Sequence, residues 1–352
     1  MRKLIPIFLL TSVLYLVMIY FSAPITNFDA KSYNVIGVLT LNKISIYPDP
    51  AISRHPYFPL FLYWEAGAQG LSQITHIPQL TLLKCFFTLF HLFSIYSIFI
   101  LSKKNIKTAL LYALNPISLL IITFHGQFDI IPLSLMLYSI ILLQQKKYSR
   151  IFVLLGIAFT LKTWPALFIV PFLKRIPKKF WFWFLVPPIA MVILYMLLFN
   201  TPLFSIARVL AVYQGVGGIW GFGKVLSFIS ASKIVLFIYK LFFVSGLIFY
   251  SFKLRKSSPI EEISSLLLFF FIFTPGFGIQ WFLWLVPSFF LTKRPFMAML
   301  YIPILIALII GYTTWIPFIP ISESTNMMIL GLVYPLFPLY LLVQKILPQT
   351  RQ

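Results

Sequence analysis

Apolar residues form long stretches along most of the chain, and short polar or basic segments separate one stretch from the next. A helix of about 20 apolar residues crosses the roughly 30 Å hydrocarbon core of a bilayer. The pattern therefore predicts an all-α fold, a polytopic bundle of transmembrane helices with about 11–12 crossings. The main expected spans are Leu4–Phe21, Leu80–Leu101, Thr108–Thr123, Ile130–Leu143, Phe180–Phe199, Val235–Phe252, Ile263–Thr274, Trp281–Leu291, Phe296–Tyr312 and Met327–Val343.

Residues 22–79 break this pattern with several prolines and scattered charges, which exclude one membrane-spanning helix there. We interpret them as a long first extracytoplasmic loop within a single integral-membrane domain of residues 1–352. Helices near Asp29–Leu41 and Phe58–Ile74 are expected to lie along the membrane interface. We expect the aromatic side chains of the second helix to face lipid. These are Phe58, Phe61, Tyr63 and Trp64.

A broken hairpin is predicted where two apolar stretches are each too short to span. Ile151–Leu161 and Trp164–Leu173 meet at Lys162, before a strongly basic segment. Their junction should point outward, which would place Lys162 inside the bundle, facing protein or water and in need of a counter-anion. The alternative is that its long side chain reaches the membrane surface.

Composition and charge narrow the class of protein. The chain is 60% hydrophobic and 10% charged, which excludes an ordinary soluble fold. Its formal net charge of +21 comes from Lys and Arg clusters between the apolar stretches. By the positive-inside rule, this multi-pass cell-membrane protein should have both termini in the cytoplasm. The basic charge thus indicates topology and contact with anionic membrane lipids, and no nucleic-acid partner is expected. The single cysteine, Cys85, excludes an intrachain disulfide and a cysteine-based metal site.

Carboxylates are scarce, with seven acidic residues in 352, so each one outside the cytoplasmic linkers is a candidate for chemistry. Asp29 follows the first predicted helix on its outer side. Partial burial at the interface would raise its pKa and make it a better base toward a hydroxyl. The alternative is an ordinary exposed loop aspartate.

Two further segments hold polar groups that could meet a ligand. His125, Gln127 and Asp129 lie on one short turn between two spans, where they can converge on a ligand or simply form a solvated helix cap. Gln280 and Trp281 follow a Pro-Gly break, where an amide and an indole can contact a sugar. The alternative for these two is the aromatic belt at the membrane interface.

The ordered series of these segments resembles the integral-membrane glycosyltransferases of the GT-C superfamily. It is most similar to the polyprenol-phosphate-mannose-dependent mannosyltransferases of bacteria and archaea, and more distantly to the first mannosyltransferase of GPI-anchor synthesis. The matching segments are Asp29 with Tyr33, Ile46-Tyr47, His55 to Leu60, Asn115-Pro116, His125 to Asp129, Gly156, Leu161 to Pro165, and Gly278 to Trp281 with Trp284 and Pro287.

The resemblance implies a polyprenyl-phosphate sugar donor, an acceptor hydroxyl on a lipid-linked glycan or protein, and inversion at the sugar on the extracytoplasmic face. Asp29 would be the catalytic base, and Lys162 would stabilise the leaving phosphate. The remaining expected substrate-binding residues are Tyr33, His55, Tyr57, His125, Gln127, Asp129, Gln280 and Trp281. No cofactor is expected, and a metal is not indicated, because Asn27-Phe28-Asp29 lacks the acid-x-acid pair of some GPI-type enzymes.

A transporter or flippase of a lipid-linked sugar is the main alternative. Such a protein would place ionisable residues near the membrane midplane. Here the acids map almost entirely to outer loops or cytoplasmic linkers, which favours an enzyme that faces one side. A non-catalytic membrane scaffold would not explain the long first loop or the broken hairpin.

Overall fold

The computed structural model describes residues 2–25, 27–47, 55–212, 221–223, 226, 232–254, 258–292, 297–313 and 337–339. These residues form helices and connecting turns, with no strand among them. The chain divides into two compact units, Met1–Tyr213 and Gln214–Gln352. The all-helical prediction is confirmed for the described residues.

Five helices in the described part are long and apolar enough to cross a membrane: Arg2–Phe21, Gln79–Leu101, Ile106–His125, Lys178–Phe199 and Ile234–Lys253. Large apolar side chains on two of them are highly exposed, such as Leu197 at 78% and Phe242 at 71%, as suits contact with lipid. The membrane class is therefore supported. The full number of crossings and the side of each loop stay predictions, and the span at Met327–Val343 lies outside the described residues except for 337–339.

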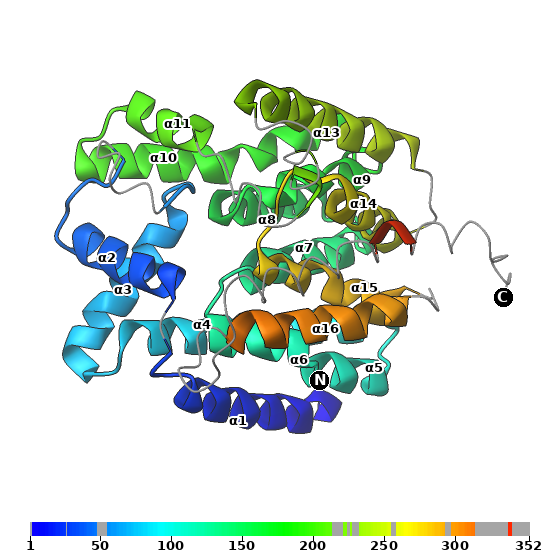
Figure 1. Cartoon of the computed structure of the whole chain (residues 1–352), viewed down its shortest axis with the longest axis horizontal. Coiled ribbons are helices and arrows are strands. Elements are labelled where there is room, and N and C mark those ends of the chain that lie inside the picture. The colour runs from blue at the N-terminus through cyan, green and yellow to red at the C-terminus, as the bar shows by residue number, and fades with distance from the viewer. Residues whose placement is uncertain are drawn as a thin grey trace, which may run out of the picture. The chain divides into compact units, whose positions relative to one another are not determined.

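The first unit is built around helices that pack in succession. Helix α2 lies along α3 beyond one end of α1 and α4, while α4 packs on α7 and α7 on α8 (Figure 1). The elements of this unit are η1 (Arg2–Leu4), α1 (Ile5–Phe21), α2 (Phe28–Leu41), α3 (Leu60–Thr75), α4 (Gln79–Leu101), α5 (Ile106–Ala113), α6 (Pro116–Leu119), η3 (Leu120–His125), α7 (Ile130–Gln144), α8 (Tyr148–Leu161), η4 (Trp164–Phe168), α9 (Val170–Leu173), η5 (Lys178–Phe184), α10 (Val186–Phe199) and α11 (Leu203–Val212).

Helices α2 and α3 lie where two helices are predicted, near Asp29–Leu41 and Phe58–Ile74, while their position in an outer loop along the membrane interface stays a prediction. The expectation that all the aromatic residues near α3 face lipid is wrong for Phe61, which is fully buried. Its ring stacks on Phe128 with 3.8 Å between ring centroids and lies 6.3 Å from the ring of Phe87 on α4. Phe61 thus joins α3 to α4 and to the turn before α7. The spacing of apolar residues in the sequence identifies an apolar helix face. It does not show whether that face packs against the protein or against lipid.

A π-helical turn ends the helix before the predicted site. Asn115 caps α6 by accepting a hydrogen bond from the N–H of Ser118 at 2.8 Å, and Pro116 occupies the first turn. The chain then widens into η3, where the N–H groups of Gly126 and Gln127 both donate to the carbonyl of Ile121, at 3.1 and 3.2 Å. Gly126 has a φ of 76°, a left-handed conformation that suits glycine. The chain therefore leaves the helix axis at residues 125–129.

The predicted break between two short helices at Lys162 is also found, while the outward direction of the hairpin tip stays a prediction. Helix α8 ends at Leu161, Lys162 is extended, and η4 and α9 follow as short pieces that each carry a proline in their first turn. The resulting break places Lys162 at the end of α8.

The second unit contains α13 (Lys233–Lys253), α14 (Pro259–Phe273), η6 (Ile279–Leu285), α15 (Val286–Leu291) and α16 (Met297–Thr313). Helix α13 packs along α14, and the Tyr239 hydroxyl donates to the carbonyl of Phe273 at 2.7 Å. Gly278 precedes η6 in extended conformation.

Candidate functional site

Asn27 determines where α2 begins and connects it to the end of η3. Its Oδ1 accepts a hydrogen bond from the N–H of Ala30 at 2.8 Å, which is the N-cap arrangement of a helix start. Its Nδ2 donates to the carbonyl of His125 at 2.8 Å. Asp29 consequently lies in the first turn of α2, where the helix N-terminus favours a negative charge.

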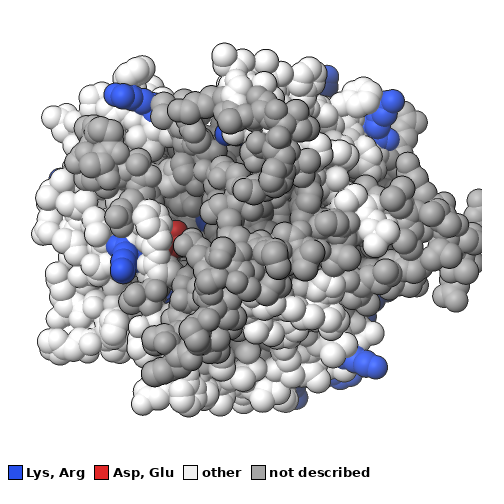
Figure 2. All heavy atoms as spheres, in the orientation of Figure 1, with Lys and Arg blue, Asp and Glu red and all other residues white. Residues whose placement is uncertain are grey.

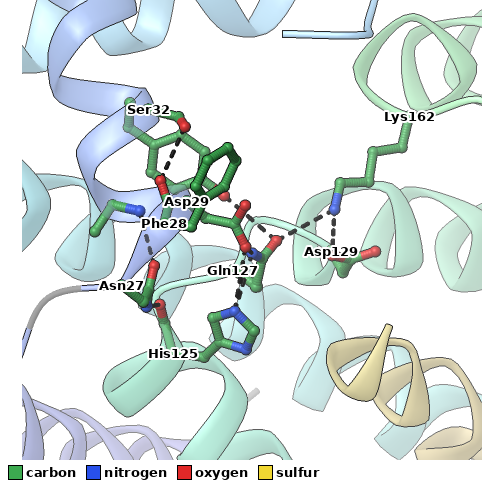
Figure 3. Close-up of polar contacts among 10 residues, drawn as sticks. Asn27, Phe28, Asp29, Ser32, His125, Gln127, Asp129 and Lys162 are labelled. Carbon is green, nitrogen blue, oxygen red and sulfur yellow. Dashed lines mark hydrogen bonds and ion pairs between the residues drawn. The ribbon is translucent and has the colours of Figure 1, made fainter. Parts of the chain in front are cut away.

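Asp29 is held by two side chains from the 125–129 segment (Figure 3). The Nε2 of Gln127 donates to Oδ2 of Asp29, and Nε2 of His125 lies 3.3 Å from the same oxygen. The Asp29 side chain is nevertheless 36% exposed. The carboxylate is therefore fixed in position while part of its surface stays open to a ligand.

Gln127 lies between Asp29 and Lys162 (Figure 3). Its Nε2 end faces Asp29, and its Oε1 accepts hydrogen bonds from the Tyr33 hydroxyl and from Nζ of Lys162, both at 3.3 Å. This orientation of the amide is chemically consistent, because the donor end meets the carboxylate and the acceptor end meets two donors. A single side chain thus links Asp29 to Lys162.

Lys162 forms an ion pair in the interior of the first unit. Its Nζ donates to Oδ2 of Asp129 at 2.5 Å and lies 4.3 Å from the ring centroid of Phe128. Both charged side chains are buried, so the alternative that Lys162 reaches the membrane surface is wrong. Asp129 precedes α7 but makes no side-chain capping bond, so the solvated-cap interpretation is also wrong for this residue. The expected counter-anion of Lys162 is therefore a carboxylate of the chain itself.

Aromatic rings form one wall beside the ammonium group. Tyr57 packs edge-on against Phe128 with 5.4 Å between ring centroids, and its own ring lies 5.5 Å from Nζ of Lys162. The buried ring of His55 packs edge-on against Tyr57 with 5.3 Å between ring centroids. Of these two expected substrate-binding residues, Tyr57 lies beside Lys162, and His55 contacts Tyr57.

The pKa of Asp29 is shifted in the direction opposite to the sequence-based expectation. Burial raises it, but hydrogen bonding and charge from His125, together with Lys162 and Gln127, lower it below its ordinary value of 3.8. Asp29 is therefore an ionised carboxylate at neutral pH. The sequence could not give this result because all three opposing groups come from distant parts of the chain.

Tyr33 is protonated at neutral pH and acts as a hydrogen-bond donor. Burial raises the pKa of its phenol well above 10.0, and the negative charge of Asp29 raises it further. The hydroxyl can then hold the Oε1 end of Gln127 in place.

Gln280 and Trp281 belong to the second unit, on η6. Trp281 stacks on Trp284 with 4.8 Å between ring centroids and 15° between ring planes. Their contribution to the cluster around Asp29 stays a prediction.

Sequence reasoning overlooked two residues that build the site. Asn27 was not assigned a role, although an asparagine directly before a helical segment is an N-cap signal. Phe128 lies within the matching segment but is not among the expected substrate-binding residues, yet it is fully buried with its ring centroid 4.3 Å from Nζ of Lys162. The only indication in the sequence that Phe128 belongs to the site is its position between the polar residues Gln127 and Asp129.

The chemical content of the site is an accessible carboxylate connected through an amide to a buried ammonium. Among the described residues, no three His, Cys, Asp or Glu side chains come together as a metal site would need. On the face of the molecule in Figure 2, acidic atoms of the described residues show at one place, in a hollow, while Lys and Arg show at several. Acidic residues are scarce in this chain, seven in 352, which makes the partly exposed Asp29 carboxylate distinctive.

Comparison with known proteins gives no family. No family model, no curated protein and no solved structure matches this chain.

Proposed function

We propose that this chain is a membrane glycosyltransferase that moves a sugar, mannose by resemblance, from a polyprenyl-phosphate donor to a hydroxyl of a lipid-linked glycan or protein. The observation that carries the proposal is the partly exposed, ionised Asp29, connected to the buried Lys162 through one amide. In this proposal both termini are cytoplasmic and the site faces the extracytoplasmic side.

The transfer needs one base. The acceptor oxygen forms a bond to the anomeric carbon while the bond from that carbon to the phosphate oxygen breaks. The configuration at the anomeric carbon is thereby inverted. Asp29 takes the hydroxyl proton, and the polyprenyl phosphate leaves with the bonding electrons. A phosphate is already a good leaving group, so the second carboxylic acid used in glycoside hydrolysis is unnecessary.

A lowered pKa is compatible with this role. The acceptor hydroxyl becomes strongly acidic only as its bond to carbon forms, so the carboxylate takes the proton late in the step. Gln127 and His125 fix the orientation of the Asp29 carboxylate, so that its exposed part can face the acceptor. Correct positioning of the base accounts for a large part of general base catalysis.

Lys162 supplies a fixed positive charge near the leaving group. Its pairing with Asp129 and Gln127 means that the ammonium is oriented before the substrate binds. A preorganised charge in a site sheltered from water stabilises developing negative charge more than a mobile one does. Tyr57 and Phe128 would then flank the same charge from the aromatic side.

A second candidate function is transport of a lipid-linked sugar. The observation in its favour is the buried Lys162–Asp129 pair, since transporters use ionisable residues within the bundle. In that case Asp29 would bind the sugar without taking a proton.

The test compares sugar transfer by purified wild type and Asp29→Asn, using a synthetic polyprenyl-phosphate mannose and a lipid-linked glycan acceptor in detergent. Removing a general base should lower kcat by about 10²–10⁴-fold. Lys147→Ala, which removes an exposed lysine between α7 and α8, should transfer at the wild-type rate. Folded Asp29→Asn protein with wild-type kcat would contradict the assignment of Asp29 as base.

A further inference from the structure

A buried carboxyl group on α3 lies behind the site without a hydrogen-bond partner. Glu65 is 1% exposed, and neither of its carboxyl oxygens is hydrogen-bonded among the described residues. Buried polar groups in folded proteins are almost always paired, because otherwise their hydration is lost without replacement. This carboxyl group therefore needs a physical explanation.

His55 is the ionisable side chain that faces Glu65. Its Nδ1 lies 3.6 Å from Oε2 of Glu65, and its Nε2 lies 3.4 Å from the carbonyl of Phe58. When Nε2 carries the proton and points it at this carbonyl, Nδ1 is left as an acceptor. The acceptor nitrogen then faces a carboxyl oxygen, an arrangement that becomes favourable when the carboxyl group itself carries a proton.

We propose that Glu65 is a protonated carboxylic acid that donates a hydrogen bond to Nδ1 of His55, and that this neutral pair holds the segment carrying Tyr57 in place. The present separation of 3.6 Å is about 0.8 Å longer than a formed hydrogen bond from a hydroxyl donor, so the carboxyl group has to move toward Nδ1 to form it. Neither residue then needs a counter-ion in the interior.

The electrostatics of the surroundings agree with a neutral pair. Burial raises the pKa of Glu65 well above 4.5. Burial lowers the pKa of His55 to about 3, against an opposing effect of the Phe58 carbonyl. The other titratable groups that interact with Glu65 are Tyr33 on α2 and Tyr47 after α2, and both are phenols without a positive charge. No described cation is therefore placed to keep Glu65 ionised.

The pair reaches the site through aromatic contacts. The His55 ring packs edge-on against Tyr57 and lies parallel to Phe61 at 6° and 6.4 Å between ring centroids. Tyr57 in turn lies 5.5 Å from Nζ of Lys162. Glu65 and His55 are thus positioning residues that act through Tyr57. Their effect on catalysis rests on the proposed function, whereas their protonation state does not.

Infrared difference spectroscopy tests the protonation state directly. The spectrum of wild type minus Glu65→Gln at pH 7 should contain the carbonyl stretch of a protonated carboxylic acid. His55→Leu should keep this band and shift it toward the frequency of an acid without a hydrogen bond. Asp29→Asn is the matched control and should leave the band unchanged, because Asp29 is ionised. Carboxylate bands in place of the acid band at Glu65 would overturn the proposal.

A comparison of Glu65→Leu with the more conservative Glu65→Gln tests whether Glu65 positions Tyr57 through His55. Glu65→Leu cannot donate to His55 and should lower the melting temperature and raise the KM for the donor lipid about tenfold, with a smaller change in kcat. Glu65→Gln has an amide N–H that can donate to Nδ1, so it should recover most of both losses. Equal losses in Glu65→Gln and Glu65→Leu would contradict the donor role. If wild type transfers no sugar, the proposed function fails, while the infrared band and the melting temperatures still decide the pair.

Discussion

Single residues decide the charge state of the site. Lys162 and Asp129 form a buried pair, and removing water from both charges is costly unless each satisfies the other. The added contact from Lys162 to Gln127 extends this pair to Asp29 without placing a second carboxylate on the ammonium. The two acids of the site therefore differ in their surroundings: Asp129 balances the charge of Lys162, and Asp29 is the carboxylate that we propose contacts the ligand.

The buried pair predicts a strong asymmetry between single and double substitutions. Asp129→Asn leaves the buried ammonium without its carboxylate and should reduce the free energy of unfolding by about 3–5 kcal/mol. Asp129→Asn combined with Lys162→Met should recover a large part of that loss because no uncompensated charge is left. Denaturant unfolding in detergent measures both. Additive losses in the double variant would show that the pair is not coupled.

The lowered pKa of Asp29 predicts the pH dependence of transfer. In the proposed mechanism Asp29 can take a proton only when it is ionised, so kcat/KM should decline on the acid side only below pH 3.8, the ordinary pKa of this carboxyl group. The same sign holds for stability: Asp29 contributes fully above pH 3.8, and the contribution is lost as the pH falls through its lowered pKa.

Replacing His125 tests the cause of this shift. His125→Ala removes the largest of the effects that lower the pKa of Asp29, so the acid limb of kcat/KM should move to higher pH. His76→Asn, at an exposed histidine that ends α3, is the matched control and should leave the limb in place. An unmoved limb in His125→Ala would show that His125 does not set the charge of Asp29.

At the scale of elements, the π-helical turn η3 and the glycine after it orient the polar side chains of residues 125–129. The turn carries the chain out of the α6 axis, and Gly126 reverses it in a left-handed conformation. His125 and Gln127 then reach Asp29, while Asp129 reaches Lys162. An uninterrupted α-helix would instead turn Gln127 about 200° away from His125 and put Asp129 on the same face as His125.

Gly126→Ala should therefore destabilise the fold. A Cβ there would lie 3.1 Å from side-chain atoms of Leu80 and of Lys84, in addition to roughly 1–2 kcal/mol for a left-handed alanine. Gly67→Ala is the matched control: no atom lies within 4 Å of its added Cβ, and in the exposed face of α3 it should stabilise by about 0.5–1 kcal/mol. Equal melting temperatures of the two variants would contradict the role of Gly126.

The elements were more predictable from sequence than their contacts. Lengths of apolar stretches placed α1, α4 and α13, and the short stretches on both sides of Lys162 predicted the broken hairpin, because membrane thickness sets these lengths. The inward face of Phe61 and the lowered pKa of Asp29 could not be predicted. Both depend on partners far away in the sequence, Phe128 for the first and His125 with Lys162 for the second.

At the scale of the whole molecule, the chain combines lipid-suited outer surfaces with a polar centre in its first unit. Helices α10 and α13 expose large apolar side chains, while Asp29, Gln127 and Lys162 contact one another among buried aromatic rings. This organisation suits a reaction between a lipid-attached donor and a polar acceptor. In the proposed function, the donor tail would stay in the membrane while its sugar phosphate reaches the protein.

The most direct test of the proposed function is to measure whether the sugar is transferred from its lipid donor to the acceptor. Purified wild type in liposomes would be given polyprenyl-phosphate mannose labelled in the sugar, together with a lipid-linked glycan acceptor. We predict that label appears in the acceptor with inverted anomeric configuration, and that one polyprenyl phosphate is released for each sugar moved. Labelled donor that crosses the bilayer with its sugar still attached, and no labelled acceptor, would contradict the account and establish transport.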